Sequence, residues 1–171
     1  AAPINWAIIN GETKTGVTTF FIDDKIDTGA MILSKETIIE KEENAGMLHD
    51  RLMHIGSETV VATLNLIESN KVNTTIQEDN EGIKTAYKLN KENCKIDWNQ
   101  SAENIHNLIR GLSPYPAAWC YFKDNSTEYN VKIYESKIVT ESHSKPIGSI
   151  VSTKKELKIA VQNGFIEILS L

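Results

Sequence analysis

The chain of 171 residues is long enough for one domain or two small ones, and either size can bury a hydrophobic core. Its 40% hydrophobic and 24% charged residues are ordinary for a globular protein, and no apolar run is long enough to cross a membrane. The two cysteines, Cys94 and Cys120, are too few for a disulfide framework and lack metal-site spacing. These features exclude a membrane-spanning or disulfide-stapled protein, and we expect plain thiols in a reducing cytoplasm.

The net charge of −5 is unevenly distributed along the chain. Residues 1–85 contain 7 Lys and Arg against 14 Asp and Glu, whereas residues 86–171 contain 11 against 9. The second half is therefore mildly basic. This balance permits contact with nucleic-acid phosphates without requiring it.

The first half of the sequence predicts helices and strands in alternation. Pro3 suits the first turn of a helix, since its missing N–H would be unpaired there. Asn44 can cap a long helix whose apolar residues recur every three or four positions. This order indicates an α/β layer in which the long helix covers the strands. The predicted elements are a helix over 3–9, strands over 17–22 and 31–39, and a helix over 44–69.

The second half begins with a polar stretch, residues 70–93, which predicts a linker between domains. Ser101 is a good cap for a helix that ends at Gly111 and the prolines after it. Gln162-Asn163-Gly164 predicts a hairpin, because Asn-Gly accepts positive φ at both central positions. Five short strands after a helix predict a small barrel such as an OB-fold. The predicted strands cover 119–123, 130–139, 147–152, 157–161 and 165–169.

A polar turn, residues 23–29, joins the two strands of the first half and ends in Asp27-Thr28-Gly29. This pattern holds a carboxylate at a strand edge, where a ligand could reach it. Asp and Gly are also ordinary turn formers, so a purely structural turn is an open alternative. The same triplet occurs in aspartic proteases, which need two such carboxylates. Nothing else in the chain repeats it, so that function would require a dimer.

Five motifs follow one another along the chain: Ala1-Ala2-Pro3-Ile4, Thr15-Gly16-Val17-Thr18, Ile26-Asp27-Thr28-Gly29-Ala30-Met31, Lys95-Ile96-Asp97-Trp98 and the run from Ile109 to Trp119. Together they resemble the motifs of folate-dependent formyltransferases. The first half resembles the end of their catalytic domain, and the second half resembles the C-terminal domain of the methionyl-tRNA formyltransferase family. The resemblance is collinear over nearly the whole chain, which makes it more specific than any single motif.

The resemblance implies a fragment with an α/β part followed by an all-β part. Residues 1–70 would be the C-terminal portion of a Rossmann-like catalytic domain and 71–93 the linker. Residues 94–171 would be a helix plus an OB-fold-like tRNA-binding barrel, truncated at its end. The implied activity is transfer of a formyl group from 10-formyltetrahydrofolate to the methionyl α-amino group of initiator tRNA. We expect no metal, no membrane association, and a cytoplasmic monomer when the enzyme is intact.

By the same resemblance, Asp27 is the catalytic carboxylate. The Asn and His of the family's catalytic set lie upstream of Ala1, so we expect the 171 residues alone to be inactive. The turn would bind the folate through Asp24, Lys25 and Ile26, mostly by backbone groups. The apolar side chains of the turn could be core or pocket wall. Candidate tRNA contacts are Lys88, Lys91, Arg110, Lys123 and Lys132.

The histidines and two alternative functions complete the sequence-based expectations. His49 and His54 are five apart and do not share a helix face as metal ligands would, so we expect them at the surface. We expect His106 to be packed or hydrogen-bonded. A nucleotide-sugar formyltransferase could carry a similar C-terminal domain and would act on amino-sugar nucleotides. A non-enzymatic RNA-binding module would bind RNA through residues 86–171 without any folate.

Overall fold

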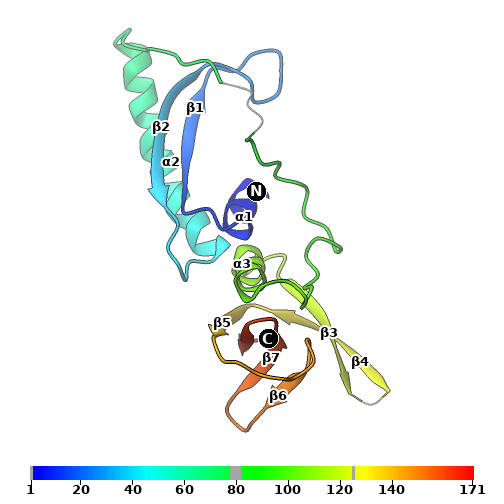
Figure 1. Cartoon of the computed structure of the whole chain (residues 1–171). Coiled ribbons are helices and arrows are strands. Elements are labelled where there is room, and N and C mark those ends of the chain that lie inside the picture. The colour runs from blue at the N-terminus through cyan, green and yellow to red at the C-terminus, as the bar shows by residue number, and fades with distance from the viewer. Residues whose placement is uncertain (1, 78–81, 125) are drawn as a thin grey trace. The chain divides into compact units, whose positions relative to one another are not determined.

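The computed structural model describes residues 2–77, 82–124 and 126–171 (Figure 1). These residues divide into two compact units. Unit 1 draws its described residues from Ala1–Glu12, Lys41–Gly46 and Ala86–Leu171, and unit 2 from Thr13–Glu40 and Met47–Thr85. The elements are α1 (Ala2–Ile9), β1 (Lys14–Phe20), β2 (Met31–Ile38), α2 (Ala45–Glu68), α3 (Ala102–Leu112), β3 (Ala118–Asp124), β4 (Thr127–Ile133), β5 (Glu135–Val139), β6 (Ile150–Ser152), β7 (Leu157–Val161) and β8 (Gly164–Ser170).

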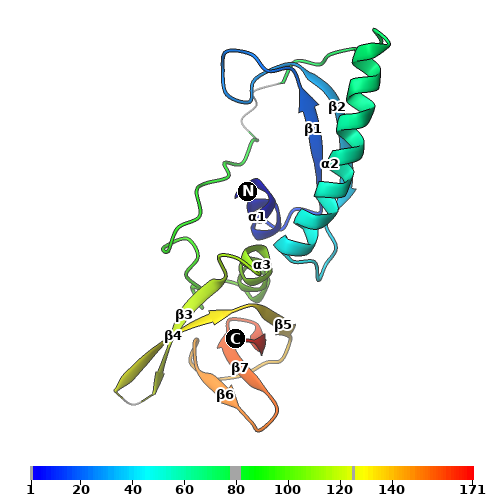
Figure 2. The same cartoon turned by 180° about the vertical axis from the view of Figure 1, so that it is seen from behind.

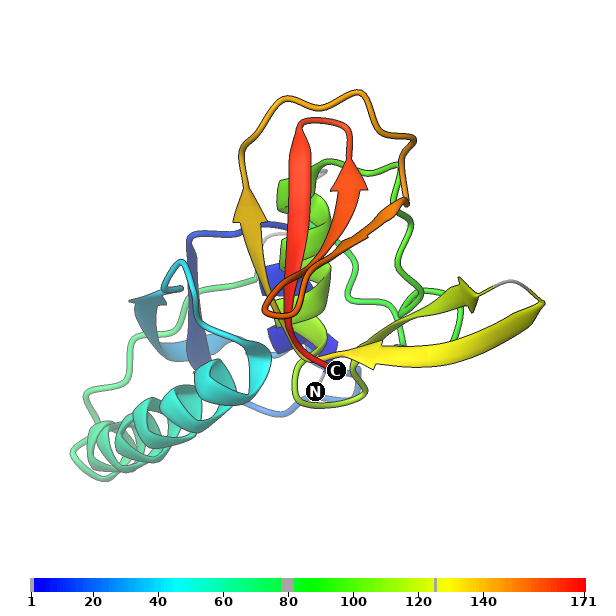
Figure 3. The same cartoon turned by 90° about the horizontal axis from the view of Figure 1, so that it is seen from below.

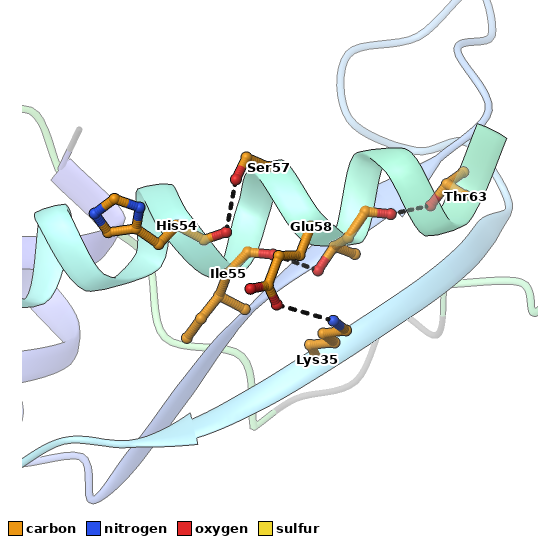
Figure 4. A network of polar contacts seen from close by, with 7 residues as sticks. Lys35, His54, Ile55, Ser57, Glu58 and Thr63 are labelled. Atoms are coloured by element: carbon orange, nitrogen blue, oxygen red, sulfur yellow. Dashed lines mark hydrogen bonds and ion pairs between the residues drawn. The ribbon is translucent and has the colours of Figure 1, made fainter. Parts of the chain in front are cut away.

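Unit 2 consists of the antiparallel hairpin β1–β2 with α2 running along it, as the views from front and back both show (Figures 1 and 2). Several polar contacts join the helix to the hairpin, among them a hydrogen bond from Arg51 Nη1 to the Thr37 hydroxyl. The hydroxyls of Thr19 and Thr63 are 2.7 Å apart, and Arg51 donates from Nη2 to the carbonyl oxygen of Ile38 at 2.6 Å. Lys35 and Glu58 form an ion pair at 3.5 Å (Figure 4). The helix therefore covers the hairpin as the apolar periodicity of residues 44–69 predicts.

The α2 side of this contact is apolar with two threonines inserted. Of the residues at the predicted spacing, Leu48, Leu52 and Thr59 are buried, whereas Ile55, Ala62 and Leu66 are half-buried. The hydroxyl of Thr59 donates to the carbonyl oxygen of Ile55 at 2.6 Å, and that of Thr63 donates to Thr59 at 2.8 Å (Figure 4). Because each hydroxyl donates to its own helix one turn earlier, both threonines can be buried, and the Thr63 hydroxyl also contacts that of Thr19.

In unit 1, α1 packs against α3 (Figure 1). The buried side chain of Asn5 donates from Nδ2 to the carbonyl oxygen of Gly111 at 2.8 Å and ties the two helices together. The Ser101 hydroxyl accepts from the Asn104 amide at 3.1 Å, so the predicted N-cap of α3 is confirmed. After α3 the chain passes through two cis peptide bonds, Ser113–Pro114 and Tyr115–Pro116, and enters β3.

The strands of unit 1 form two antiparallel sheets. One is the hairpin β3–β4, and the other has four strands in the order β5-β8-β7-β6, with β8 inside it between β5 and β7 (Figure 3). The core lies between α3 and these strands. Its largest fully buried side chains come from the helix and from β4, β7 and β8: Ile105, Ile109, Leu112, Ile133, Ile159, Val161 and Ile166.

The predicted strand over 130–139 is wrong as a single element, because it divides into β4 and β5 around Tyr134. The hairpin after β7 is confirmed, but its turn differs from the prediction. Val161 pairs with Gly164, so Gln162 and Asn163 form the turn and Gly164 opens β8. Glycine is required there because φ is +139° and a Cβ would lie 2.1 Å from the carbonyl oxygen of Val139. The residue types of Asp124-Asn125 also predict a turn after the first strand of the second half. Asn125 lies outside the described residues.

Candidate functional site

The acidic turn is a closed loop between β1 and β2, at one end of the hairpin (Figure 1). The strand before it ends at Phe20, two residues earlier than predicted, and the Phe21 amide donates to the carbonyl oxygen of Ala30 at 3.0 Å. Inside the loop, Asp23 Oδ1 accepts from the Lys25 amide and from the Thr28 hydroxyl, both at 3.0 Å. Asp23 is therefore the carboxylate that organises the loop.

Gly29 lets the two ends of this loop come together. A Cβ at this position would lie 1.5 Å from the carbonyl oxygen of Phe21, which no side chain can tolerate. The glycine of the Asp-Thr-Gly triplet therefore has a steric role in closing the loop. The glycine of Asp27-Thr28-Gly29 is thus needed for the structure of the turn. This structural role of Gly29 does not exclude a function for Asp27.

Asp27 lies at the exposed end of the loop with a backbone φ of +57°. Aspartate is one of the few residues that adopt this left-handed conformation readily. The neighbouring side chains of Asp24, Lys25 and Ile26 are also exposed, and the exposed fractions of Ile22 and Ile26 are 92% and 89%. These two isoleucines are therefore not core residues of the described chain. The loop presents carboxylates beside apolar side chains to solvent.

Two residues that the sequence interpretation missed reach this loop from the segment after α2. Thr75 pairs with Met31 through two backbone hydrogen bonds, of 2.8 and 2.9 Å. Gln77 contacts the carbonyl oxygens of Asp27 and Gly29. Both residues belong to the polar stretch predicted as a linker, in which no apolar periodicity distinguishes them.

A second candidate surface lies on one face of the β3–β4 hairpin. Alternate residues of a strand share a face, and paired residues of antiparallel strands lie side by side. Trp119, Tyr121 and Lys123 therefore lie on the same face as their partners Lys132, Asn130 and Glu128. The opposite face carries Cys120 and Ile133, which are buried in the core. Trp119 is itself buried and belongs to the core cluster, whereas Tyr121, Lys123 and the three partners on β4 are exposed. The face is therefore open to solvent beyond Trp119, and we refer to it as the lysine–aromatic face.

Two further lysines lie over the aromatic rings of this face. The Lys91 ammonium is 5.2 Å from the Trp119 ring centre, and the Lys95 ammonium is 5.5 Å from Trp119 and 5.8 Å from Tyr121. The indole of Trp119 donates to the Lys91 carbonyl oxygen at 2.7 Å. This hydrogen bond holds the segment around Lys91 against the β3–β4 hairpin. Lys91, Lys123 and Lys132 were predicted sites, whereas Lys95 was missed although it lies in a motif singled out for its resemblance.

The remaining predicted basic residues have different surroundings. Lys88 is exposed, and its carbonyl oxygen accepts from the Asn93 side chain at 2.9 Å. Arg110 is half-buried. Its guanidinium donates to Asn107 Oδ1 and to the carbonyl oxygen of Glu43, each at 2.9 Å. The structure therefore brings Arg110 into contacts within unit 1 rather than onto the lysine–aromatic face.

The three histidines with a predicted environment, His49, His54 and His106, lie where the sequence predicts. His49 and His54 are exposed, and His106 is buried with Nδ1 3.1 Å from the Ser136 hydroxyl. Burial lowers the pKa of His106, and the Glu42 carboxylate, 3.9 Å from Nε2, partly opposes this shift. The described residues contain no group of three or more His, Cys, Asp or Glu side chains that could hold a metal ion. None of the helices in the described part of the chain combines the length and apolarity needed to cross a bilayer.

The chain matches two families. Residues 1–64 match the family described as "Formyl transferase", and residues 88–171 match "Formyl transferase, C-terminal domain". Over all 171 residues, the chain is 70% identical to a methionyl-tRNA formyltransferase of Flavobacterium johnsoniae, covering 54% of that protein. It is 44% identical over 176 aligned positions to a methionyl-tRNA formyltransferase of Bacteroides thetaiotaomicron, covering 55% of it. The chain thus spans about half the length of these relatives.

Solved structures with low sequence identity share the fold. An N-formyltransferase from Helicobacter canadensis, in complex with folinic acid and dTDP-3-aminofucose, superimposes with a TM-score of 0.72 at 22% identity. That match covers 99% of this chain and 60% of the other. HypX from Aquifex aeolicus, in complex with tetrahydrofolic acid, superimposes with a TM-score of 0.70 at 20% identity, covering 98% of this chain and 29% of the other. At these identities the likeness concerns the fold alone.

Proposed function

Because the chain belongs to the formyl transferase family, we propose that the protein carrying it transfers a formyl group from 10-formyltetrahydrofolate to the α-amino group of methionine on initiator tRNA. The observation that carries this proposal is the 70% identity to a methionyl-tRNA formyltransferase along the whole chain. The loop that presents Asp27 lies within this matched length. Two solved relatives, at lower identity, bind folates according to their descriptions.

The proposed reaction begins when the methionyl amine attacks the formyl carbon. Negative charge then develops on the formyl oxygen, the amine must lose a proton, and the folate nitrogen must gain one. We assign to Asp27 the carboxylate role, in which it orients a histidine, stabilises its protonated form and holds a water that relays protons. The histidine and the asparagine of the family's set lie in a segment outside these 171 residues. The exposure of Asp27 supports this role, because a partner segment can reach its carboxylate.

We further propose that the acidic loop forms part of the folate site, with the main chain of Asp24, Lys25 and Ile26 facing the pterin. The exposed Ile22 and Ile26 side chains support this proposal, since a flat heterocycle gains by covering apolar surface. The Lys25 amide already donates to Asp23, whereas the other peptide groups of this exposed stretch can bind the polar edge of a pterin. No metal takes part in this scheme.

For the fold, we propose that residues 1–70 complete a Rossmann-like domain and that residues 94–171 form an OB-fold-like domain after a linker. Large exposed apolar side chains on α2 and β2 support the Rossmann-like domain, because an exposed apolar surface indicates that another element covers it. The residues concerned are Ile38, Met53, Val60 and Leu64. The helix followed by a four-stranded antiparallel sheet supports the second part.

We propose that initiator tRNA contacts the lysine–aromatic face and the adjacent Lys88. Four lysines around Trp119 and Tyr121 provide ammonium groups for phosphates, and the exposed ring of Tyr121 provides surface for a sugar or base, whereas Trp119 is buried. Glu128, opposite Lys123, is the acidic residue of this face. The contacts of Arg110 within unit 1 favour a structural role for that residue over a phosphate contact.

The choice of acceptor is tested by assaying the full-length enzyme with methionyl-tRNA and with amino-sugar nucleotides at equal concentrations. We expect formylation of methionyl-tRNA only. Relatives of 44–70% identity carry the methionyl-tRNA name, whereas the sugar enzyme with the matching fold is 22% identical. Formylation of the sugar nucleotide alone would overturn the choice. RNA binding by the full-length protein without any folate binding would support the non-enzymatic alternative instead.

The 171 residues by themselves are proposed to be inactive, because the asparagine and histidine of the catalytic set are not among them. The purified 171-residue chain should release no formyl-methionyl-tRNA above the rate without enzyme. Detectable turnover by this chain would show that its own side chains supply the missing groups.

A further inference from the structure

Gln77 lies against the loop that carries Asp27, although 50 residues separate the two in sequence. Its Nε2 donates to the carbonyl oxygen of Asp27 at 2.9 Å and to that of Gly29 at 2.8 Å. Both partners are acceptors, so only the NH₂ end of the amide can bind here, and the orientation of the amide is determined. Both amide hydrogens are used, one on each side of Thr28.

The backbone around Gln77 is anchored independently of its side chain. Thr75, two residues earlier, exchanges two backbone hydrogen bonds with Met31 at the start of β2. This pairing sets the segment beside the end of the acidic loop. The Gln77 side chain therefore has to span only a short, fixed gap to reach the two carbonyl groups.

The hydrogen bonds of the loop separate into two sets. Asp23 binds Lys25 and Thr28 within the loop, while Gln77 alone among the described residues binds the main chain of Asp27 from outside it. Asp27 has a φ of +57°, a left-handed conformation that aspartate tolerates but that is not its most populated one, so contacts of its main chain help to keep it there. The direction of the Asp27 side chain depends on that φ, because the Cα–Cβ bond turns with the backbone.

We propose that Gln77 is a positioning residue that holds the main chain of Asp27 and Gly29 so that the Asp27 carboxylate keeps its working direction. This inference rests on the role proposed above for Asp27. Gln77 does not touch the reacting groups and acts only through the loop. Without it, the loop ends stay closed by Phe21 and Ala30, but the carboxylate gains freedom to turn away.

The test uses the full-length enzyme with Gln77→Ala, Gln77→Glu and a matched control, Gln162→Ala. Gln162 also donates from Nε2 to a carbonyl oxygen, that of Asn99 at 3.0 Å, but in unit 1. We expect kcat/KM for methionyl-tRNA to fall about 10-fold in Gln77→Ala, as for a misplaced catalytic group. Gln77→Glu should lose at least as much, because a carboxylate cannot donate to either carbonyl. The control should keep its rate, and all three variants should keep their melting temperature.

A double-mutant cycle with Asp27→Asn separates positioning from general damage. If Gln77 acts through the Asp27 carboxylate, Gln77→Ala should change the rate of the Asp27→Asn enzyme by less than about twofold. Hydrogen exchange of the peptide that spans residues 21–31 should become faster in Gln77→Ala and remain unchanged in Gln162→Ala.

The outcomes distinguish the positioning role of Gln77 from the catalytic role proposed for Asp27. A slow Asp27→Asn enzyme with a normal Gln77→Ala enzyme overturns only the positioning role. An additive loss in the double variant also overturns it, because Gln77 would then act on something other than Asp27. A normal Asp27→Asn enzyme overturns both proposals at once.

Discussion

Arg110 donates a hydrogen bond from Nη1 to the main-chain oxygen of Glu43, 2.9 Å away. The same guanidinium donates from Nε to Asn107, so it joins the segment before α2 to helix α3 within unit 1. Arginine suits this place because its planar fork supplies several donors in fixed directions. A residue chosen from sequence as an RNA contact is thus better explained as part of the framework.

Arg110→Ala should therefore destabilise the protein. We expect the free energy of unfolding to fall by about 1.5–3 kcal/mol, the usual range for hydrogen bonds to a charged group. Lys132→Ala, which removes an exposed lysine of β4, should change it by less than about 0.5 kcal/mol. Urea denaturation followed by circular dichroism measures both. Equal midpoints for Arg110→Ala and the wild type would refute the structural role.

Removing lysines from the lysine–aromatic face should weaken tRNA binding and its dependence on salt. For the double variant Lys123→Ala/Lys132→Ala, the slope of log K against log salt should become shallower by about 1.4–1.8, because each of the two phosphate contacts contributes about 0.7–0.9. Lys137→Ala, an exposed lysine on β5, serves as the control. Filter binding of initiator tRNA at several salt concentrations measures the slopes. A double variant with the wild-type slope would exclude these two lysines from the interface.

The two thiols should be unreactive in the folded protein. Both are buried, and burial raises the pKa of Cys94 and raises that of Cys120 to about 11, so neither forms the reactive thiolate at pH 8. Iodoacetamide at pH 8 followed by peptide mapping should modify neither residue until guanidinium is added. Rapid labelling of Cys120 without denaturant would contradict its place in the core.

Stability should fall as the pH drops below about 6.5, the ordinary pKa of histidine, partly because of His106. Burial lowers the pKa of His106 in the folded state, while Glu42 raises it and Arg110 and Lys41 lower it further. Between the lowered pKa of the folded state and 6.5, His106 binds a proton in the unfolded chain but not in the folded chain. Proton binding therefore favours the unfolded state, and the free energy of unfolding falls. His106→Gln should lose less melting temperature than the wild type between pH 7.5 and pH 5. Equal losses would show that His106 does not contribute.

Most of the secondary structure could be predicted from apolar periodicity and from capping residues. Ser101 and the apolar repeat of α2 predicted their helices, because both signals are local. The division of the predicted strand 130–139 was not accessible, since Tyr134 carries no local turn signal. The hairpin at 162–164 was predicted, but its turn was predicted one residue too long, because Gly164 already pairs with Val161 in the strand. The close contact between Gly164 and the Val139 carbonyl oxygen cannot be predicted from local sequence.

The candidate site was only partly accessible for a related reason. Asp27 lies in a motif of consecutive residues, which the sequence alone reveals. Lys123 and Lys132 are charged residues within predicted strands, so they could be predicted to lie at the surface. Gln77 and Lys95 become visible only through partners distant in sequence, Asp27 for the first and Trp119 for the second. Arg110 shows the reverse, because its positive charge was evident but its buried contacts with Glu43 were not.

The central claim is that the Asp27 carboxylate takes part in formyl transfer, and the turnover of Asp27→Asn in the full-length enzyme tests it most directly. Asparagine tolerates the same φ and matches the shape of aspartate, so the melting temperature should stay unchanged. Asp50→Asn, the same change at an exposed position of α2, is the matched control and should keep the wild-type rate. The account predicts a kcat for methionyl-tRNA formylation lower by about 100-fold or more in Asp27→Asn. A folded Asp27→Asn enzyme with a kcat close to that of the wild type would contradict it.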